Sequence, residues 1–204
     1  MAQNEKKIYR SVEAIWDDVR LTLTRGVADA RHPWHHPVIG TMGPSGVELR
    51  TVILRRYIPD RRLLAFHTDR RSPKIAHITA DPRVAWLFYD PVGKVQLRIS
   101  AHAEIHVDTP LAEEQWERTQ LYSRRCYMAP HAPSDPVPEW DPNLPEAIRD
   151  RRPETEESEA GRVNFAVVAT RVESIDWLYL RGRGHQRARL TWPAGRLKGQ
   201  WLAP

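Results

Sequence analysis

Apolar residues recur at helical spacing near the amino terminus and at strand spacing through most of the remaining chain. The first set is spaced by three or four positions and follows Ser11, which suits a helix N-cap: Val12, Ile15, Trp16, Val19, Leu23 and Val27. This pattern predicts an amphipathic helix over about 12–29. Two further helices are predicted where a hydroxyl residue precedes proline, at Ser72-Pro73 (to about 80) and Thr109-Pro110 (to about 122).

Short runs rich in branched or alternating apolar residues predict β-strands, because turn residues such as Gly43-Pro44-Ser45-Gly46 separate them. The predicted strands cover 37–42, 47–57, 62–68, 84–89, 94–107, 163–172, 175–180, 185–192 and 199–202. Many strands with few intervening helices favour a mainly β fold with flanking helices. A closed antiparallel barrel is preferred over a doubly wound sheet.

One segment departs from this pattern of short strands and helices. Seven of the chain's 17 prolines lie between Met128 and Pro153, and an acidic run follows at 154–159. We therefore expect a long, mostly irregular excursion over about 128–160. At 204 residues, the chain is predicted to form a single domain, 1–204, that includes this excursion.

Composition narrows the class of protein. Hydrophobic residues make up 41% and charged residues 28%, which is ordinary globular usage. No apolar run is long enough to span a membrane, and no apolar stretch follows the lysines of MAQNEKKIYR, so we expect an unexported, cytoplasmic protein. The single cysteine, Cys126, excludes an internal disulfide, and we expect it to be packed rather than nucleophilic.

The positive charge is concentrated in one stretch. The net charge is +5, and 50–74 carries eight basic residues against two acidic ones. Within it, Arg50 and Thr68 lie on predicted strands, while Ser72 and Lys74 lie at the start of a predicted helix. Cations, hydroxyls and free helix N–H groups together suit a phosphate monoester. The alternative is that these residues are only the solvated rims of strands.

Other sites have less support. The chain lacks the glycine-rich nucleotide-binding motifs, Gly-x-Ser-x-Gly and His-Glu-x-x-His. His32, His35 and His36 crowd one segment without a nearby acid, and adjacent histidines on an extended chain would point to opposite faces, so no metal site is expected. Nucleic-acid binding through the basic hairpins is ranked last, because interleaved aromatic residues are missing.

Five segments in register resemble the pyridoxamine 5'-phosphate oxidase-like FMN-binding split-barrel family. They are Arg50-Thr51-Val52-Ile53-Leu54-Arg55, Phe66-His67-Thr68, Ser72-Pro73-Lys74, Ala85-Trp86-Leu87-Phe88-Tyr89 and Gln96-Leu97-Arg98-Ile99. The carboxy-terminal Arg183-Gly184-His185-Gln186-Arg187 and Trp201-Leu202-Ala203-Pro204 agree. The resemblance covers about 38–127 and 163–204, and it implies an FMN-binding split β-barrel of the antiparallel Greek-key type.

The resemblance also implies roles for individual residues. The FMN-binding positions would be Arg50, Thr51, Val52, Ile53, His67, Thr68, Ser72, Lys74, Gln96, Trp177 and Arg187, and the substrate-binding positions would be Arg55, Arg183 and His185. His67 replaces an aromatic residue, Arg55 replaces a lysine, and the spacing before Arg183 is one residue short for Trp177. No side chain is assigned as a catalytic acid or base, since the flavin carries the redox chemistry.

These features predict a homodimer with FMN at the subunit interface that transfers hydride or electrons to or from a small anionic substrate. One alternative is a pyridoxamine or pyridoxine 5'-phosphate oxidase proper, with Arg183 and His185 holding the substrate phosphate. Another is a non-catalytic protein that binds flavin or haem, with His67 or His185 as haem ligands. The substrate itself is left open by the sequence.

Overall fold

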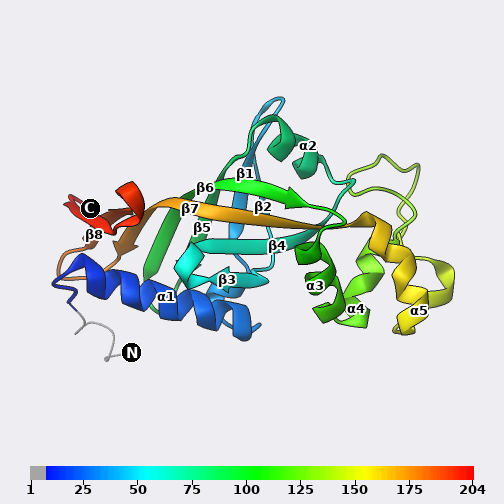
Figure 1. Ribbon diagram of the computed structural model, residues 1–204, viewed down its shortest axis with the longest axis horizontal. Helices are drawn as coiled ribbons and strands as arrows, with labels where there is room; N and C mark the ends of the chain where they lie inside the picture. The colour runs from blue at the N-terminus through cyan, green and yellow to red at the C-terminus, as the bar shows by residue number, and fades with distance from the viewer. Residues whose placement is uncertain (1–7) are drawn as a thin grey trace.

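The structure is a computed structural model that describes residues 8–204 (Figure 1). The expectation of an unexported protein rested partly on the stretch MAQNEKKIYR. Residues 1–7 of this stretch lie outside the described residues. The described helices include none long and apolar enough to cross a membrane. The fold is mainly antiparallel sheet with flanking helices, as predicted.

The strands form one sheet that divides at its longest member. They are β1 (Val38–Gly43), β2 (Gly46–Thr51), β3 (Arg56–Ile58), β4 (Leu63–Asp69), β5 (Arg83–Asp90), β6 (Val95–His106), β7 (Phe165–Tyr179), β8 (Gln186–Thr191) and β9 (Lys198–Leu202). Their order is β2-β1-β5-β6-β7-β4-β3, and β8 pairs with β7 and β9. The first half of β7 pairs with β4 and the second half with β8, so the sheet splits there.

Two predicted strand boundaries are wrong. The runs 163–172 and 175–180 form the single strand β7, because a register shift opposite Ser100 and Ala101 absorbs Glu173 as a bulge. The run 47–57 is instead divided into β2 and β3. Between them the backbone leaves β1 for β4: Val52 donates its N–H to Pro37 at 2.9 Å, and Arg55 donates to Ala65 at 2.9 Å.

The predicted helices form where their caps indicated. They are α1 (Val12–Ala28), α2 (Pro73–Ala80) and α3 (Pro110–Arg118). The Ser11 hydroxyl accepts from the N–H of Ala14 at 3.2 Å, as an N-cap does. The third helix ends before the predicted 122, because Thr119 turns to extended backbone. A separate short helix, α4 (Leu121–Arg124), follows it.

The excursion predicted over 128–160 is largely irregular. It contains only the short turn η5 (Glu146–Ile148) and the helix α5 (Thr155–Ser158) before η6 (Glu159–Asn164). Arg125 fixes it to the body of the protein, since its guanidinium donates to the carbonyls of Ile148, Arg149 and Arg151 at 3.0–3.1 Å. In Figure 1 this segment lies beside α3 and α4 at the right-hand end of the molecule.

The main core lies between the sheet and α1. The buried face of α1 contributes Ile15, Val19 and Leu23, each at most 1% exposed. The helix α1, which lies in the lower part of Figure 1, contacts β3, β8 and β9. The largest fully buried rings are Trp34, Trp86, Trp177, Phe66, Phe88 and Phe165. Burial of such rings is the dominant stabilising term of the fold.

Candidate functional site

The predicted phosphate-binding residues meet at the start of α2. The ammonium group of Lys74 donates to Thr68 Oγ1 at 3.0 Å and to Ser72 Oγ at 2.6 Å, joining the end of β4 to the first turn of the helix. Ser72 therefore makes no capping bond to the helix backbone. Burial, and next the charge of Arg50, lower the pKa of Lys74 below its ordinary value. A bound anion would relieve this repulsion between the two cations.

Arg50 reaches this cluster from β2. Its guanidinium donates to Thr41 Oγ1 and to Glu48, whose backbone oxygen and carboxylate both lie at 2.9 Å. The buried ring of His77 stands behind it, with Nδ1 at 3.3 Å from Thr41 Oγ1. Thr41, Glu48 and His77 were missed by sequence reasoning, because strand and helix bring them together without a local motif. We call Arg50, Thr68, Ser72 and Lys74 the phosphate cluster.

The donor set of the phosphate cluster fits a phosphate monoester. Two cations and two hydroxyls lie around the amino end of α2, an eight-residue helix whose dipole also favours an anion at this end. The segment Thr51-Val52-Ile53 leads directly away from Arg50, with Val52 and Ile53 half-buried. A ring system attached to the phosphate would therefore meet this segment, which agrees with the positions that the family resemblance implies.

His67 belongs to a different part of the molecule from the phosphate cluster. Neighbouring residues of a strand point to opposite faces, so His67 faces α3 while Thr68 faces α2. His67 lines a cavity of about 610 Å³ together with Arg55, Tyr57, Gln115 and other residues of β3, α1 and α3. We call this cavity the Arg55 cavity. Two predicted residues, one assigned to cofactor and one to substrate, are therefore neighbours there.

The environment of His67 keeps its imidazole neutral. Its Nε2 lies 3.3 Å from Gln115 Oε1 and its Nδ1 lies 3.5 Å from Thr119 Oγ1. Burial, and then the charge of Arg55, lower the pKa of His67 to about 4, although the bond to Gln115 opposes the shift. At neutral pH this ring can exchange hydrogen bonds with a ligand without adding charge to the cavity.

The shifted pKa of His67 predicts a dependence of stability on pH. Between about pH 6.5 and pH 4 the unfolded chain binds a proton that folded His67 refuses, so acid destabilises the fold. We expect this residue to reduce the free energy of unfolding by about 2 kcal/mol between pH 7 and pH 5. Urea unfolding at both pH values checks this. A His67→Asn variant should lose this part of the pH dependence, and an identical dependence in both proteins would contradict the assignment.

Gln96 and Arg187 lie on the outer face of the sheet, away from the phosphate cluster. Gln96 pairs with Leu178, which pairs with Arg187 across the next strand. Arg187 is held by Asp176, to which it donates at 2.9–3.0 Å, and Arg98 donates to the same carboxylate at 2.6 Å. Both predicted cofactor residues are therefore presented on a surface of the chain.

The structure does not place Trp177 with them. Its side chain is 1% exposed and packs edge-on against Tyr9 at 4.9 Å between ring centroids, inside the core. Because strand residues alternate between faces, Leu178 takes the outward position between Gln96 and Arg187. This orientation agrees with the spacing before Arg183, which is one residue shorter than the family pattern requires for Trp177. In one chain, the Trp177 side chain therefore faces the core and lies on the opposite face of the sheet from Gln96 and Arg187.

Arg183 and His185 lie in the connection between β7 and β8. His185 Nδ1 accepts from the backbone N–H of Arg181 at 3.0 Å, and Arg183 is exposed beside Gly184, whose φ of 104° suits glycine. Figure 1 shows β8 at the left end of the molecule and α2 at its top. One chain therefore does not bring Arg183, His185 and Arg187 to the phosphate cluster.

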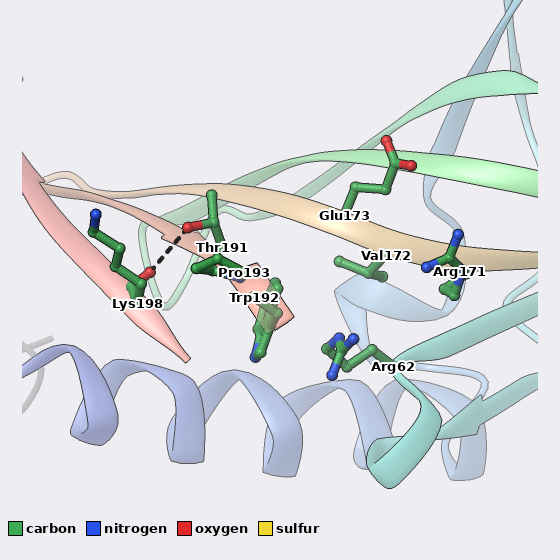
Figure 2. A pocket seen from close by; sticks show the side chains of 8 residues that line it. All are labelled: Arg62, Arg171, Val172, Glu173, Thr191, Trp192, Pro193 and Lys198. Carbon is green, nitrogen blue, oxygen red and sulfur yellow. Dashed lines mark hydrogen bonds between the residues drawn. The ribbon is translucent and has the colours of Figure 1, made fainter. Parts of the chain in front are cut away.

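A second cavity, of about 490 Å³, opens between α1 and the outer strands (Figure 2). Arg62 stacks over the Trp192 ring there at 5.0 Å, and Thr191 donates to the Lys198 carbonyl at 3.3 Å. Arg171 and Glu173 complete its rim. None of the residues assigned to cofactor or substrate lines this cavity.

The histidine-rich segment forms a short turn, η2 (Pro33–His35), rather than the extended chain considered above. His35 Nδ1 lies 2.6 Å from the Gly26 carbonyl, and the His35 and His36 rings are 4.8 Å apart. Across residues 8–204, no group of three or more potential ligands could hold a metal ion. Cys126 is exposed, so the expectation that it packs in the interior is wrong.

Comparison with known proteins agrees with this geometry. Residues 16–107 match the family described as pyridoxamine 5'-phosphate oxidase, FMN-binding domain. No curated protein sequence matches the chain. The match to this family confirms the resemblance inferred from the sequence over residues 16–107.

Solved structures show the same fold along nearly the whole chain. A pyridoxamine 5'-phosphate oxidase-related, FMN binding protein from Nostoc punctiforme superposes with a TM-score of 0.70 at 20% identity, covering 97% of this chain and 99% of that one. PhzG from Burkholderia lata, in complex with tetrahydrophenazine-1-carboxylic acid, gives 0.66 at 16% identity, covering 100% and 97%. At these identities the likeness establishes the fold, which is the predicted FMN-binding split barrel.

Proposed function

We propose that this protein is an FMN-dependent oxidoreductase that acts on a small anionic substrate. The phosphate cluster carries the proposal, since Arg50, Lys74 and two hydroxyls converge at the amino end of α2. Arg50, Thr68, Ser72 and Lys74 would hold the phosphate of FMN, and Thr51-Val52-Ile53 would lie along its ring system. Bound FMN would supply hydride or electron transfer.

The residues of the chain would bind and orient the substrate beside the flavin. Leu54 and Arg55 follow the flavin-binding segment directly and line the Arg55 cavity. The cavity is large enough for a small organic molecule. The Arg55 guanidinium would attract an anion, and neutral His67 would offer a hydrogen bond. We also propose that residues 1–204 form one domain and that the protein is cytoplasmic.

The visible spectrum of the purified protein tests this function. We expect flavin absorption bands that survive addition of FMN followed by desalting, and bleaching of those bands by a suitable reductant. A colourless protein that does not retain added FMN would overturn the proposal. A Soret band would instead favour the haem-binding alternative, and formation of pyridoxal phosphate from pyridoxamine phosphate under air would identify an oxidase proper.

We further propose that two copies of the chain assemble a complete site. The outer face of the sheet exposes several large apolar side chains on adjacent strands: Met42, Val47, Leu49, Leu87 and Tyr89, which are 39–69% exposed. The pairing register places them on the same face as Gln96, Leu178 and Arg187. Such a patch on one face is typical of an interface, and a second copy would carry its own Arg187 toward the first copy's flavin segment.

A Leu49→Arg variant tests this assembly. Leu49 is 69% exposed in one chain, so the substitution should leave the monomer fold intact while placing a charge in the apolar patch. We expect light scattering after gel filtration to give twice the chain mass for the wild type and the chain mass for the variant, with FMN affinity at least about tenfold weaker. An unchanged dimer in the variant would contradict this interface. Arg83→Ala, on an exposed strand end, serves as the control.

A further inference from the structure

The charge balance in the Arg55 cavity limits the anion that it can hold. Three arginines line it: Arg55, Arg56 and Arg118. One carboxylate, that of Glu114, accepts from Arg56 at 2.8 Å and pairs with Arg118 at 3.2 Å, so it balances only one of these two charges. The same contacts lower the pKa of Glu114, chiefly through the bond from Arg56, so this carboxylate stays ionised. The charge left over belongs to Arg118, whose side chain is 71% exposed and therefore screened by water, whereas the Arg56–Glu114 pair is less exposed and neutral as a pair.

Arg55 differs from its two neighbours. Over residues 8–204 its side chain has no carboxylate within ion-pair distance and no hydrogen-bond acceptor. The adjacent titratable ring, His67, is neutral at pH 7 and adds no charge. Gln115, Thr119 and Gln120 also line the wall and carry no charge, and the wall includes a second histidine, His35, whose Nδ1 lies 2.6 Å from the Gly26 carbonyl. The cavity therefore offers one unpaired planar cation, half-buried, with neutral hydrogen-bonding groups around it.

We propose that the substrate of this site is a small organic carboxylate, held as a monoanion by Arg55, and not a phosphate monoester. This inference rests on the proposed function for the placement of the cavity beside the flavin. The two oxygens of a carboxylate match the fork of one guanidinium. A phosphate monoester brings a second negative charge near neutral pH, and the cations that could meet it, Arg56 and Arg118, are already bonded to the Glu114 carboxylate.

Three ligands that share a benzene ring test the inference. Benzoate, phenyl phosphate and benzamide are titrated at pH 8 by calorimetry into protein that has been incubated with FMN and desalted, in a buffer without phosphate. Under these conditions the phosphate group is doubly charged. We expect benzoate to bind at least about tenfold more tightly than either other ligand. Tighter binding of phenyl phosphate, or no benzoate binding at millimolar concentration, would overturn the inference.

Variants identify the group responsible. Arg55→Gln should weaken benzoate binding at least about tenfold, whereas Arg55→Lys should keep the order of preference because it keeps the charge. Arg83 pairs with Asp81 on the surface, so the control variant Arg83→Gln should bind benzoate as the wild type does. Glu114→Gln frees Arg56 and Arg118, so it should raise the affinity for phenyl phosphate about tenfold. Benzoate affinity that is unaffected in Arg55→Gln would also contradict the assignment.

The visible spectrum of each sample separates this inference from the function on which it rests. A yellow protein that prefers phenyl phosphate would retain the flavoprotein function and reject the carboxylate. A colourless protein that prefers benzoate would reject the flavin and retain the charge argument. Thermal unfolding of each variant shows whether a lost affinity reflects a lost fold, and in that event Arg55→Lys and Glu114→Gln decide the question.

Discussion

An Arg50→Ala variant is expected to bind FMN 10- to 100-fold more weakly than the wild type. One charged hydrogen bond contributes about 1.5–3 kcal/mol, which corresponds to this loss of affinity. Arg50 is suited to the role because Thr41 and Glu48 already fix its guanidinium next to Lys74. Titration of the variant with FMN, monitored through the quenching of flavin fluorescence, measures the dissociation constant. Unchanged FMN affinity would show that Arg50 does not contact the phosphate.

Two comparisons make this result specific to the phosphate. Riboflavin lacks the phosphate, so its affinity should be equal in Arg50→Ala and the wild type. Glu48→Gln should act in the opposite direction, because the Glu48 carboxylate lies 2.9 Å from the guanidinium and competes for it with a phosphate. We expect FMN to bind this variant a few-fold more tightly. A loss of riboflavin affinity in Arg50→Ala would instead indicate a general distortion of β2.

The proximity of three predicted site residues follows from local sequence. Ser72-Pro73 fixes the start of α2, and Thr68 ends the strand just before it, so Thr68, Ser72 and Lys74 had to lie close together. Thr41 and His77 could not be found in this way. They are 36 positions apart, and only the packing of α2 on β1 brings their side chains to 3.3 Å.

The orientation of Trp177 toward the core follows from strand parity. Ile175, Trp177 and Tyr179 alternate with Asp176 and Leu178, and this alternation already assigns the ring to the buried face. The family resemblance drew attention to the tryptophan itself, although a shift of one residue moves every side chain to the other face. The division of β7 into two strands has a related cause. Glu173-Ser174 resembles a turn in the sequence, but the bulge opposite β6 accommodates it within one strand.

The segment over 128–160 is attached to the rest of the protein through contacts that the sequence did not reveal. The predicted irregular excursion is held to the α3–α4 region by Arg124, whose side chain is only 6% exposed. Its guanidinium donates to Glu159 at 2.8 Å, to Ser158 at 3.0 Å and to the Trp116 carbonyl at 2.9 Å. It also lies over the Trp116 ring at 4.4 Å. One buried cation thus joins α3, α4 and α5 behind the Arg55 cavity.

An Arg124→Ala variant is therefore expected to lose about 3 kcal/mol of stability. Removing one partner of a buried ion pair is costly because the remaining polar groups lose their hydrogen bonds, here the Trp116 carbonyl and the Ser158 hydroxyl among them. The Glu159 carboxylate is half exposed and regains water, so the loss stays at the lower end of the usual range. For a chain of this size, the loss lowers the melting temperature by roughly 6–12 °C.

Arg151→Ala provides the matched comparison, because Arg151 pairs with Glu157 at 2.6 Å in the same segment but is 46% exposed. An exposed pair contributes about 0–1 kcal/mol, so this variant should melt close to the wild type. Urea unfolding of the three proteins, with FMN absent so that ligand binding does not shift the transition, measures both losses. Equal stability of the two variants would show that the excursion is a surface segment with little connection to the fold. A much larger loss in Arg124→Ala would show that it forms part of the folded body behind the Arg55 cavity.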